Sequence, residues 1–252
     1  YYFPTAGRIA GVEVLKGPAA ISQGPYTIGG AINLLSTPIA DESGGLINQE
    51  LGQDGTSRTH LHYSAVDTQV AFLVESHTWD TDGFDSIKGS DADTGFDKDD
   101  ILIKLRINSD PSLDGVYHEL NIKYQDSEES SDQSYVGLAD ADFRKDAHSR
   151  YGLSAYDNMD NSHETTSFNY IADIGNLELS ATMYDNDFAR NWFKVDKIDN
   201  NKVYGHGNGI NNIIAAANAG EATASAILNG TNAEAVEVKL KNNNRAYISE
   251  GT

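Results

Sequence analysis

The sequence predicts an all-β protein built around a long antiparallel sheet, and three observations lead to that prediction. Apolar and polar residues alternate with period two in one stretch after another downstream of residue 44, as they do in strands with one apolar and one polar face. No apolar run approaches the roughly 20 residues that a membrane-spanning helix needs. Beyond the second stretch, the connections switch regularly between short polar turns and long segments.

Composition alone would point to a soluble protein. The chain of 252 residues is acidic, with a formal net charge of −20, and contains no Cys. Its length suits one or two soluble domains. The missing Cys excludes a disulfide framework and thiolate chemistry. Because barrel strands alternate lipid-facing and lumen-facing residues, each strand carries only a weak hydropathy signal, and a transmembrane β-barrel stays compatible with this composition.

The first element of the chain is a strand, a compact loop and a second strand. Two apolar runs, at 12–15 and 31–35, bracket a segment rich in Gly and Pro. Val, Ile and Leu favour strands, whereas Gly and Pro favour tight turns. We therefore expect residues 22–27 to form the loop between two short strands.

Eight further strands follow from the alternating pattern. In the clearest stretch, 101–107, one face carries Ile101, Ile103, Leu105 and Ile107. The other face carries Lys104 and Arg106. An antiparallel sheet with one wet and one apolar face gives this pattern. The expected strands lie near 45–52, 57–66, 68–80, 98–109, 115–125, 162–173, 177–188 and 242–250.

The connections between these strands favour a membrane barrel over a soluble sandwich. Long segments lie near 81–97, 126–161 and 190–241, with short turns between them. An outer-membrane barrel has short turns at one end and long loops at the other, whereas structureless loops beyond about 15 residues are uncommon in compact domains. Residues 213–228 have a helix-forming composition, so we expect a short helix within the last long loop.

Four motifs resemble those of a known family. The opening VEVLKGP at 12–18, followed by GGAIN at 29–33, resembles the end of the plug domain of TonB-dependent outer-membrane receptors. Asp82-Gly83-Phe84, DFARNW at 187–192 and Asn243-Asn244-Arg245 resemble further motifs of the family, in its ferric-citrate-like siderophore branch. The resemblance implies that residues 1–40 are the C-terminal part of an α+β plug domain. Residues 41–252 would then be the N-terminal part of a transmembrane antiparallel β-barrel, a fragment with about 8 of about 22 strands.

The resemblance also implies a function. It indicates a non-enzymatic receptor in the bacterial outer membrane that takes up a ferric chelate, either a siderophore or a ferric citrate-like complex, without a covalently bound cofactor. The expected partners are a TonB-type energy-coupling protein, whose contact segment would lie outside this chain, and outer-membrane lipid or lipopolysaccharide, with no nucleic acid. Two alternatives stay open: a receptor for cobalamin or a carbohydrate, and a soluble, acidic, Ca²⁺-binding β-sandwich adhesin.

Candidate cargo-binding residues come first from the plug loop. Apical plug loops of the family touch the cargo from below, which nominates Gln23, Pro25 and Tyr26. Tyr26 would offer an aromatic face and Gln23 hydrogen bonds. Lys104 and Arg106 are expected to face the lumen, where they would anchor the plug through its acidic side chains or line the cargo path.

Basic residues in and near the long loops form the second group of candidates. An Arg guanidinium binds a carboxylate with two parallel hydrogen bonds, which nominates Arg144, Arg150 and Arg190 for an anionic chelate. Trp192 lies in the same motif as Arg190 and completes the set. Surface ion pairs with the many nearby carboxylates are the alternative role for each Arg.

Two patterns raise the question of a metal. Asp91, Asp93 and Asp97 alternate as Ca²⁺ ligands do, but the calcium-loop pattern fails because its Gly and closing Glu are missing, so a solvated acidic loop is favoured. His60 and His62 lie two apart on one strand face, and we interpret them as polar residues that face the lumen. No nucleophile or metal-ligand motif of an enzyme is present in the sequence.

Overall fold

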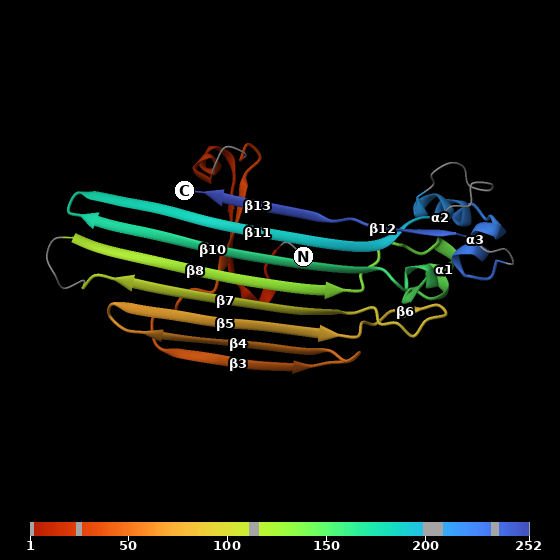
Figure 1. Ribbon diagram of the computed structural model, residues 1–252, viewed down its shortest axis with the longest axis horizontal. Helices are drawn as coiled ribbons and strands as arrows, with labels where there is room; N and C mark the ends of the chain where they lie inside the picture. Colours follow the sequence, from red (N-terminus) through yellow and green to blue (C-terminus); the bar gives the residue numbers. More distant parts are fainter. Residues whose placement is uncertain (1–2, 24–26, 111–115, 199–208, 233–236, 252) are drawn as a thin grey trace.

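The computed structural model describes residues 3–23, 27–110, 116–198, 209–232 and 237–251 (Figure 1). Its main feature is an antiparallel sheet of nine strands. Neighbouring strands run in the order β3–β4–β5–β7–β8–β10–β11, and β11 then pairs with both β12 and β13. The strands are β3 (Gly44–Leu51), β4 (Ser57–Val66), β5 (Val70–Thr81), β7 (Phe96–Asn108), β8 (Val116–Ser131), β10 (Asn158–Ile174), β11 (Leu177–Ile198), β12 (Val238–Asn242) and β13 (Arg245–Gly251).

These nine strands occupy eight rows, that is, eight positions across the sheet, because β12 and β13 share the position beside β11. The sequence predicts eight strands. β12 pairs with the second half of β11 and β13 with its middle. Between them, Asn243 exchanges two backbone hydrogen bonds with Trp192, at 2.8 and 3.4 Å. The Asn243-Asn244-Arg245 motif therefore keeps β12 and β13 in one row. The resulting open, all-antiparallel wall confirms the predicted fold class.

Three strands are longer than predicted. β8 continues to Ser131, β10 begins at Asn158 and β11 continues to Ile198, so the connections run over 132–157 and 199–237. The sequence pattern missed these ends because polar residues replace the apolar ones on the outward face there. Asp126, Glu128 and Asp160 continue the outward register past the last apolar position.

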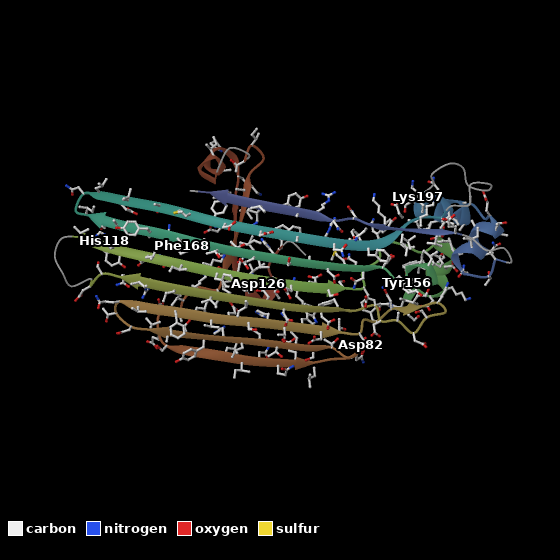
Figure 2. The ribbon with its side chains drawn as sticks, viewed as in Figure 1. Asp82, His118, Asp126, Tyr156, Phe168 and Lys197 are labelled. Carbon is white, nitrogen blue, oxygen red and sulfur yellow. The ribbon has the colours of Figure 1, made fainter. Side chains whose placement is uncertain are left out.

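One face of the sheet is apolar and open. Its exposed side chains are the ones that the alternation assigns to a single face; they include Leu61, Val70, Phe72, Val74, Ile103, Ile107, Phe168, Leu177, Leu179 and Met183. Figure 2 shows the same strands with their side chains, with Phe168 near the short-turn end and Asp82 at the loop end. A soluble sandwich would bury this face, so the adhesin alternative is not supported. A lipid-facing barrel wall leaves it exposed.

The long connections gather at one end of the sheet (Figure 1). They carry α1 (Asp140–Lys145), η3 (Gly152–Ser154), α2 (Ile210–Asn218), α3 (Ala222–Leu228) and a parallel pair of short strands, β6 (Ser86–Ile87) and β9 (Ser149–Arg150). These elements, which we call the loop cap, share a core with the end of β11 that comprises Tyr151, Val195, Ile198, Ile210, Ile213, Ala224, Ile227 and Leu228. None of the described helices is long and apolar enough to cross a membrane.

The expected helix at 213–228 is two helices. Gly220 has a φ of +89° between α2 and α3. Gly adopts this left-handed conformation at little steric cost, and it ends helices for that reason. The apolar residues on both sides of Gly220 then fold back to pack together.

The start of the chain forms the predicted strand–loop–strand unit. η1 (Ala6–Arg8) leads into β1 (Ile9–Leu15), η2 (Gly17–Gln23) follows, and β2 (Ala31–Ser36) pairs antiparallel with β1. In Figure 1 this hairpin runs across the strands of the sheet, and its loop end projects beyond β13. Val12, Val14 and Ile32 are exposed. The contacts that hold the hairpin to the sheet therefore lie near its base.

Candidate functional site

The base of the hairpin is fixed by a buried ion pair. Arg8 Nε lies 2.7 Å from Asp100 Oδ1 on β7, and the two side chains are 2% and 0% exposed. The backbone N–H of Thr5 donates to the other Asp100 oxygen at 3.1 Å. Arg8 Nη1 also donates to Gln125 Oε1 on β8 at 3.2 Å. We call the face that receives these contacts the lumenal face.

Lys104 supplies a second attachment on the lumenal face. Its Nζ donates to the backbone carbonyl of Thr37 at 2.6 Å and to that of Ser36 at 3.3 Å. The partners are carbonyl groups at the end of β2 rather than the acidic side chains that the sequence suggested. Arg106 lies on the same face, two residues further along β7 and opposite Asn121 on β8.

A cluster of cations and aromatic rings lies where β11 meets the loop cap. Lys194 Nζ is 3.6 Å from the centre of the Tyr135 ring and 4.5 Å from that of Trp192, while Arg190 Cζ is 5.5 Å from the Trp192 ring. Trp192 Nε1 donates to the carbonyl of Gln133 at 3.2 Å, which fixes the indole. We call Tyr135, Arg190, Trp192 and Lys194 the cation–aromatic cluster. Tyr135 and Lys194 were missed because neither belongs to a motif.

The remaining nominated residues are dispersed. Arg144 is exposed on α1 and binds Asp140 one turn earlier at 3.1 Å. Arg150 is buried, and its Nη1 donates to the carbonyl of Asp132 at 2.8 Å. Gln23 ends η2, but its side chain lies outside the described residues, as do Pro25 and Tyr26.

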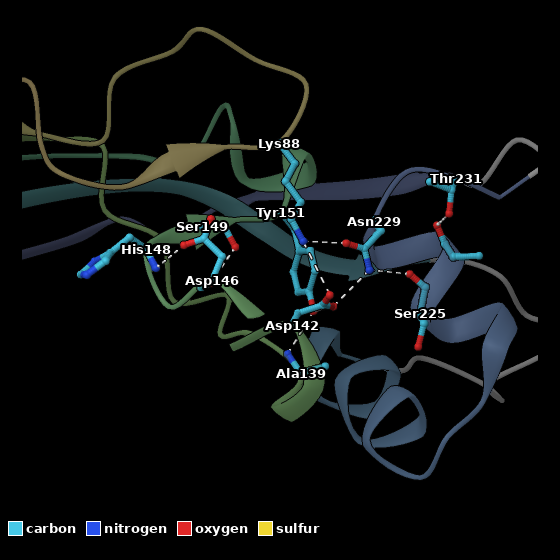
Figure 3. Close-up of polar contacts among 11 residues, drawn as sticks. Lys88, Ala139, Asp142, Asp146, His148, Ser149, Tyr151, Ser225, Asn229 and Thr231 are labelled. Carbon is cyan, nitrogen blue, oxygen red and sulfur yellow. Dashed lines mark hydrogen bonds and ion pairs between the residues drawn. The ribbon is translucent and has the colours of Figure 1, made fainter. Parts of the chain in front are cut away.

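The loop cap is tied together by polar contacts between distant residues (Figure 3). Tyr151 OH donates to Asp142 Oδ2 at 2.7 Å and accepts from the backbone N–H of Ala139 at 3.0 Å. Asn229 Nδ2 donates to Asp142 Oδ2 at 3.1 Å. Lys88 Nζ donates to Asn229 Oδ1 at 2.7 Å and lies 3.7 Å from Asp142 Oδ1.

These contacts shift two pKa values in the loop cap. Burial, together with the hydrogen bond to the Asp142 carboxylate, raises the pKa of Tyr151 to about 12. Burial by itself would raise the pKa of Asp142, but hydrogen bonds from Tyr151 and Asn229 and the Lys88 ammonium outweigh it and hold that pKa below its ordinary value. Asp142 is therefore held as a carboxylate that joins α1 to the segment after α3.

Carboxylates collect on the outward face near the loop end. A hollow of about 710 Å³ opens there and is lined by Asp97, Asp99, Glu128 and Asp160 together with residues of β11 and β13. These carboxylates alternate along their strands with residues on the lumenal face, such as Asp100 and Asn161, and Asn161 also lines the hollow. Asp91 and Asp93 are exposed on the segment before β7. The lining of the hollow therefore includes residues of both faces of the sheet, Arg190 among them.

The solved structures similar to this chain include two receptors. The ferric-catecholate import receptor Fiu from E. coli K12 matches 74% of this chain and 29% of its own at 17% identity, with a TM-score of 0.57. The siderophore receptor PirA from Acinetobacter baumannii matches 75% of this chain and 32% of its own at 18% identity, with a TM-score of 0.38. No family model and no curated protein matches the chain.

The likeness to Fiu concerns the fold. With a TM-score of 0.57, it confirms the partial antiparallel barrel that the sequence predicts. The chain spans less than a third of the length of either receptor. Fiu is named as an import receptor.

Proposed function

We propose that the chain is part of a TonB-dependent outer-membrane receptor that imports a ferric siderophore. The observation that carries this proposal is the seating of the hairpin base, at residues 5–8 and 36–40, on a polar face of a sheet whose other face is apolar and open. Arg8 and Lys104 are the main attachments. In such a receptor the seated segment belongs to a plug that closes the barrel, and a TonB-type energy-coupling protein would displace it.

The cation–aromatic cluster supports an aromatic, anionic cargo. The faces of Trp192 and Tyr135 suit stacking against flat rings, while Arg190 and Lys194 supply positive charge. This local charge offsets the net charge of −20 on the chain, which by itself repels anions at long range. A ferric catecholate combines aromatic rings with negative charge and fits the cluster better than ferric citrate, which has no ring. Fiu is named as a ferric-catecholate import receptor.

Uptake of labelled iron tests the proposal. The complete gene product would be expressed in a bacterial strain without its own receptors for ferric catecholates. We expect uptake of a ferric catecholate and an outer-membrane location for the protein. Trp192→Ala should lower uptake at limiting cargo by at least about tenfold, equivalent to about 1.4 kcal/mol of binding energy, whereas the exposed Tyr156→Ala should leave it unchanged.

The outcomes separate the receptor from its cargo. A protein found outside the outer membrane would contradict the receptor function. A correctly located receptor that imports ferric citrate, cobalamin or a carbohydrate but no catecholate would contradict the cargo assignment alone. Equal uptake by Trp192→Ala and the wild type would remove the cation–aromatic cluster from the binding site.

A further inference from the structure

Three potential metal ligands meet on the lumenal face beside the hairpin base. His60 and His62 alternate on β4, and Glu75 on β5 is the register partner of His62. The ligand atoms of the three residues all lie within 4.8 Å of one another. His60 Nε2 and Glu75 Oε1 are 2.8 Å apart. The sequence places the two imidazoles on one face, and the register of β4 with β5 adds the carboxylate.

The carboxylate in this group is buried and incompletely paired. Glu75 is fully buried, and its Oε2 makes no hydrogen bond of good geometry, although the Thr37 side chain and the Lys104 ammonium also attract the carboxylate. His62 Nδ1 is also buried without a hydrogen-bond partner. The neighbours of Glu75 on the same face include Leu73 and Leu102, both fully buried. Burying a carboxylate with an oxygen unpaired is costly. A cation bound at that oxygen would offset the cost.

The group also lies under the hairpin base. A Cβ at Gly7 would come within 2.7 Å of His77 Cε1 and 3.0 Å of Arg58 Nη2. The His77 ring stacks on His60 with centroids 3.8 Å apart, and His77 Nε2 is 3.6 Å from Glu75 Oε1. Residues 5–8 therefore pass directly over the ring that adjoins the three ligands. Any ion held there would sit between the barrel wall and the plug segment.

We propose that His60, His62 and Glu75 bind one divalent transition-metal ion of the zinc type at the interface between the hairpin base and the sheet. Two imidazole nitrogens and one carboxylate oxygen form a three-ligand set that zinc uses when a fourth position stays open. With bonds of about 2.0–2.2 Å, the ligand atoms around zinc lie roughly 3.4 Å apart. The ligand atoms, all within 4.8 Å of one another, need to approach by at most about 1.4 Å to reach that spacing. This site does not depend on the proposed cargo.

Titration of the metal-stripped protein with Zn²⁺ tests this proposal. The complete gene product would be purified in detergent, treated with a chelator and titrated in a calorimeter, with Co²⁺ absorption as a second readout of the ligand geometry. We expect one tight Zn²⁺ per chain. His62→Gln should weaken Zn²⁺ binding by more than about 100-fold. Loss of a residue that only hydrogen-bonds a metal ligand already costs up to about 100-fold in metal affinity, and loss of the ligand itself should cost more. Glu75→Gln should do the same, whereas His148→Gln in the loop cap should have no effect.

Folding of each variant is checked by its β-sheet circular dichroism. Glu75 is fully buried, so Glu75→Gln carries the larger risk of misfolding; His62 is only partly buried, and His62→Gln keeps the test decisive. The proposal would be overturned if the wild-type protein bound Zn²⁺ no more tightly than folded His62→Gln.

Discussion

Removing the Arg8 guanidinium should release the hairpin base from the sheet while leaving the sheet intact. Arg8 and Asp100 are both almost completely buried, and Arg8 is the described cation in direct contact with Asp100, while the Lys123 ammonium attracts it from further away. Breaking such a pair from one side costs about 3–5 kcal/mol, because the remaining charge stays buried without its direct partner. Arg8→Met keeps much of the volume and removes the charge. Because about 1.4 kcal/mol corresponds to a tenfold change in an equilibrium constant, we expect the fraction of molecules with a released hairpin base to rise at least about 100-fold.

Hydrogen exchange followed by mass spectrometry measures this release. The peptides that cover 5–15 and 31–40 should lose protection in Arg8→Met, whereas those of β7 and β8 should keep it. Arg144→Met is the matched control, since its ion pair with Asp140 is solvent-exposed and of the kind worth less than about 1 kcal/mol. The double variant Arg8→Met/Asp100→Leu should recover protection, because it leaves no buried charge unpaired. Equal exchange in Arg8→Met and Arg144→Met would refute this reasoning.

Three further predictions concern the loops. Tyr151→Phe removes the hydroxyl that donates to Asp142 in α1 and accepts from Ala139 at the start of that helix, so the loop cap should lose about 1–3 kcal/mol of stability, measured as faster proteolysis of the loops while the sheet stays protected. The pKa of Asp142 is lower in the folded protein than its ordinary value, so Asp142 stabilises the loop cap above the ordinary carboxyl pKa, and this stabilisation is lost as pH falls through the folded pKa. Cleavage of the loop cap by an acid-active protease should therefore rise below about pH 4. In Asp142→Asn the cleavage should change less with pH. Gly83 has a φ of +82° and lies against the backbone of Thr94, so Gly83→Ala should lower the melting temperature, as expected for about 1–3 kcal/mol of strain; Gly137→Ala, with open space at its Cβ, should not.

The rows of the sheet were predictable because the pattern that defines them is local. Along 101–107, alternate residues face opposite environments, and the period-two rule needs no knowledge of the rest of the fold. The strand ends were less predictable. Beyond the apolar face, Glu128 and Asp160 keep their strand register but lose the apolar signal. The sequence therefore shows where the apolar face ends and not where hydrogen bonding between strands ends.

The contacts of the candidate site depend on register and on distant packing. Thr5 and Asp100 are 95 residues apart, and Lys88 and Asn229 are 141 apart. No spacing rule connects residues so far apart. The imidazoles of His60 and His62 were recognisable as a pair on one face, but Glu75 joins them only because the short turn between β4 and β5 sets His62 opposite Glu75.

The motif Asp82-Gly83-Phe84 was recognised by its resemblance to the family, but the sequence did not show why these residues are needed at this position. The Asp82 N–H donates to the carbonyl of Asp54, and the Asp82 carbonyl accepts from Thr94, both at 2.9 Å. A Cβ at Gly83 would come within 2.5 Å of the Thr94 backbone. The motif therefore joins the ends of two connections at the loop end of the sheet, where only Gly fits.

We propose that one face of this sheet meets lipid and that the other meets the plug. Since the chain contains no Cys, single cysteines can be placed at each position from Ile101 to Ile107 in the complete gene product and spin-labelled in lipid vesicles. We predict that collision with oxygen, which concentrates in lipid, is high at 101, 103, 105 and 107 and low at 102, 104 and 106. Equal collision rates along the strand, or the opposite alternation, would contradict the account.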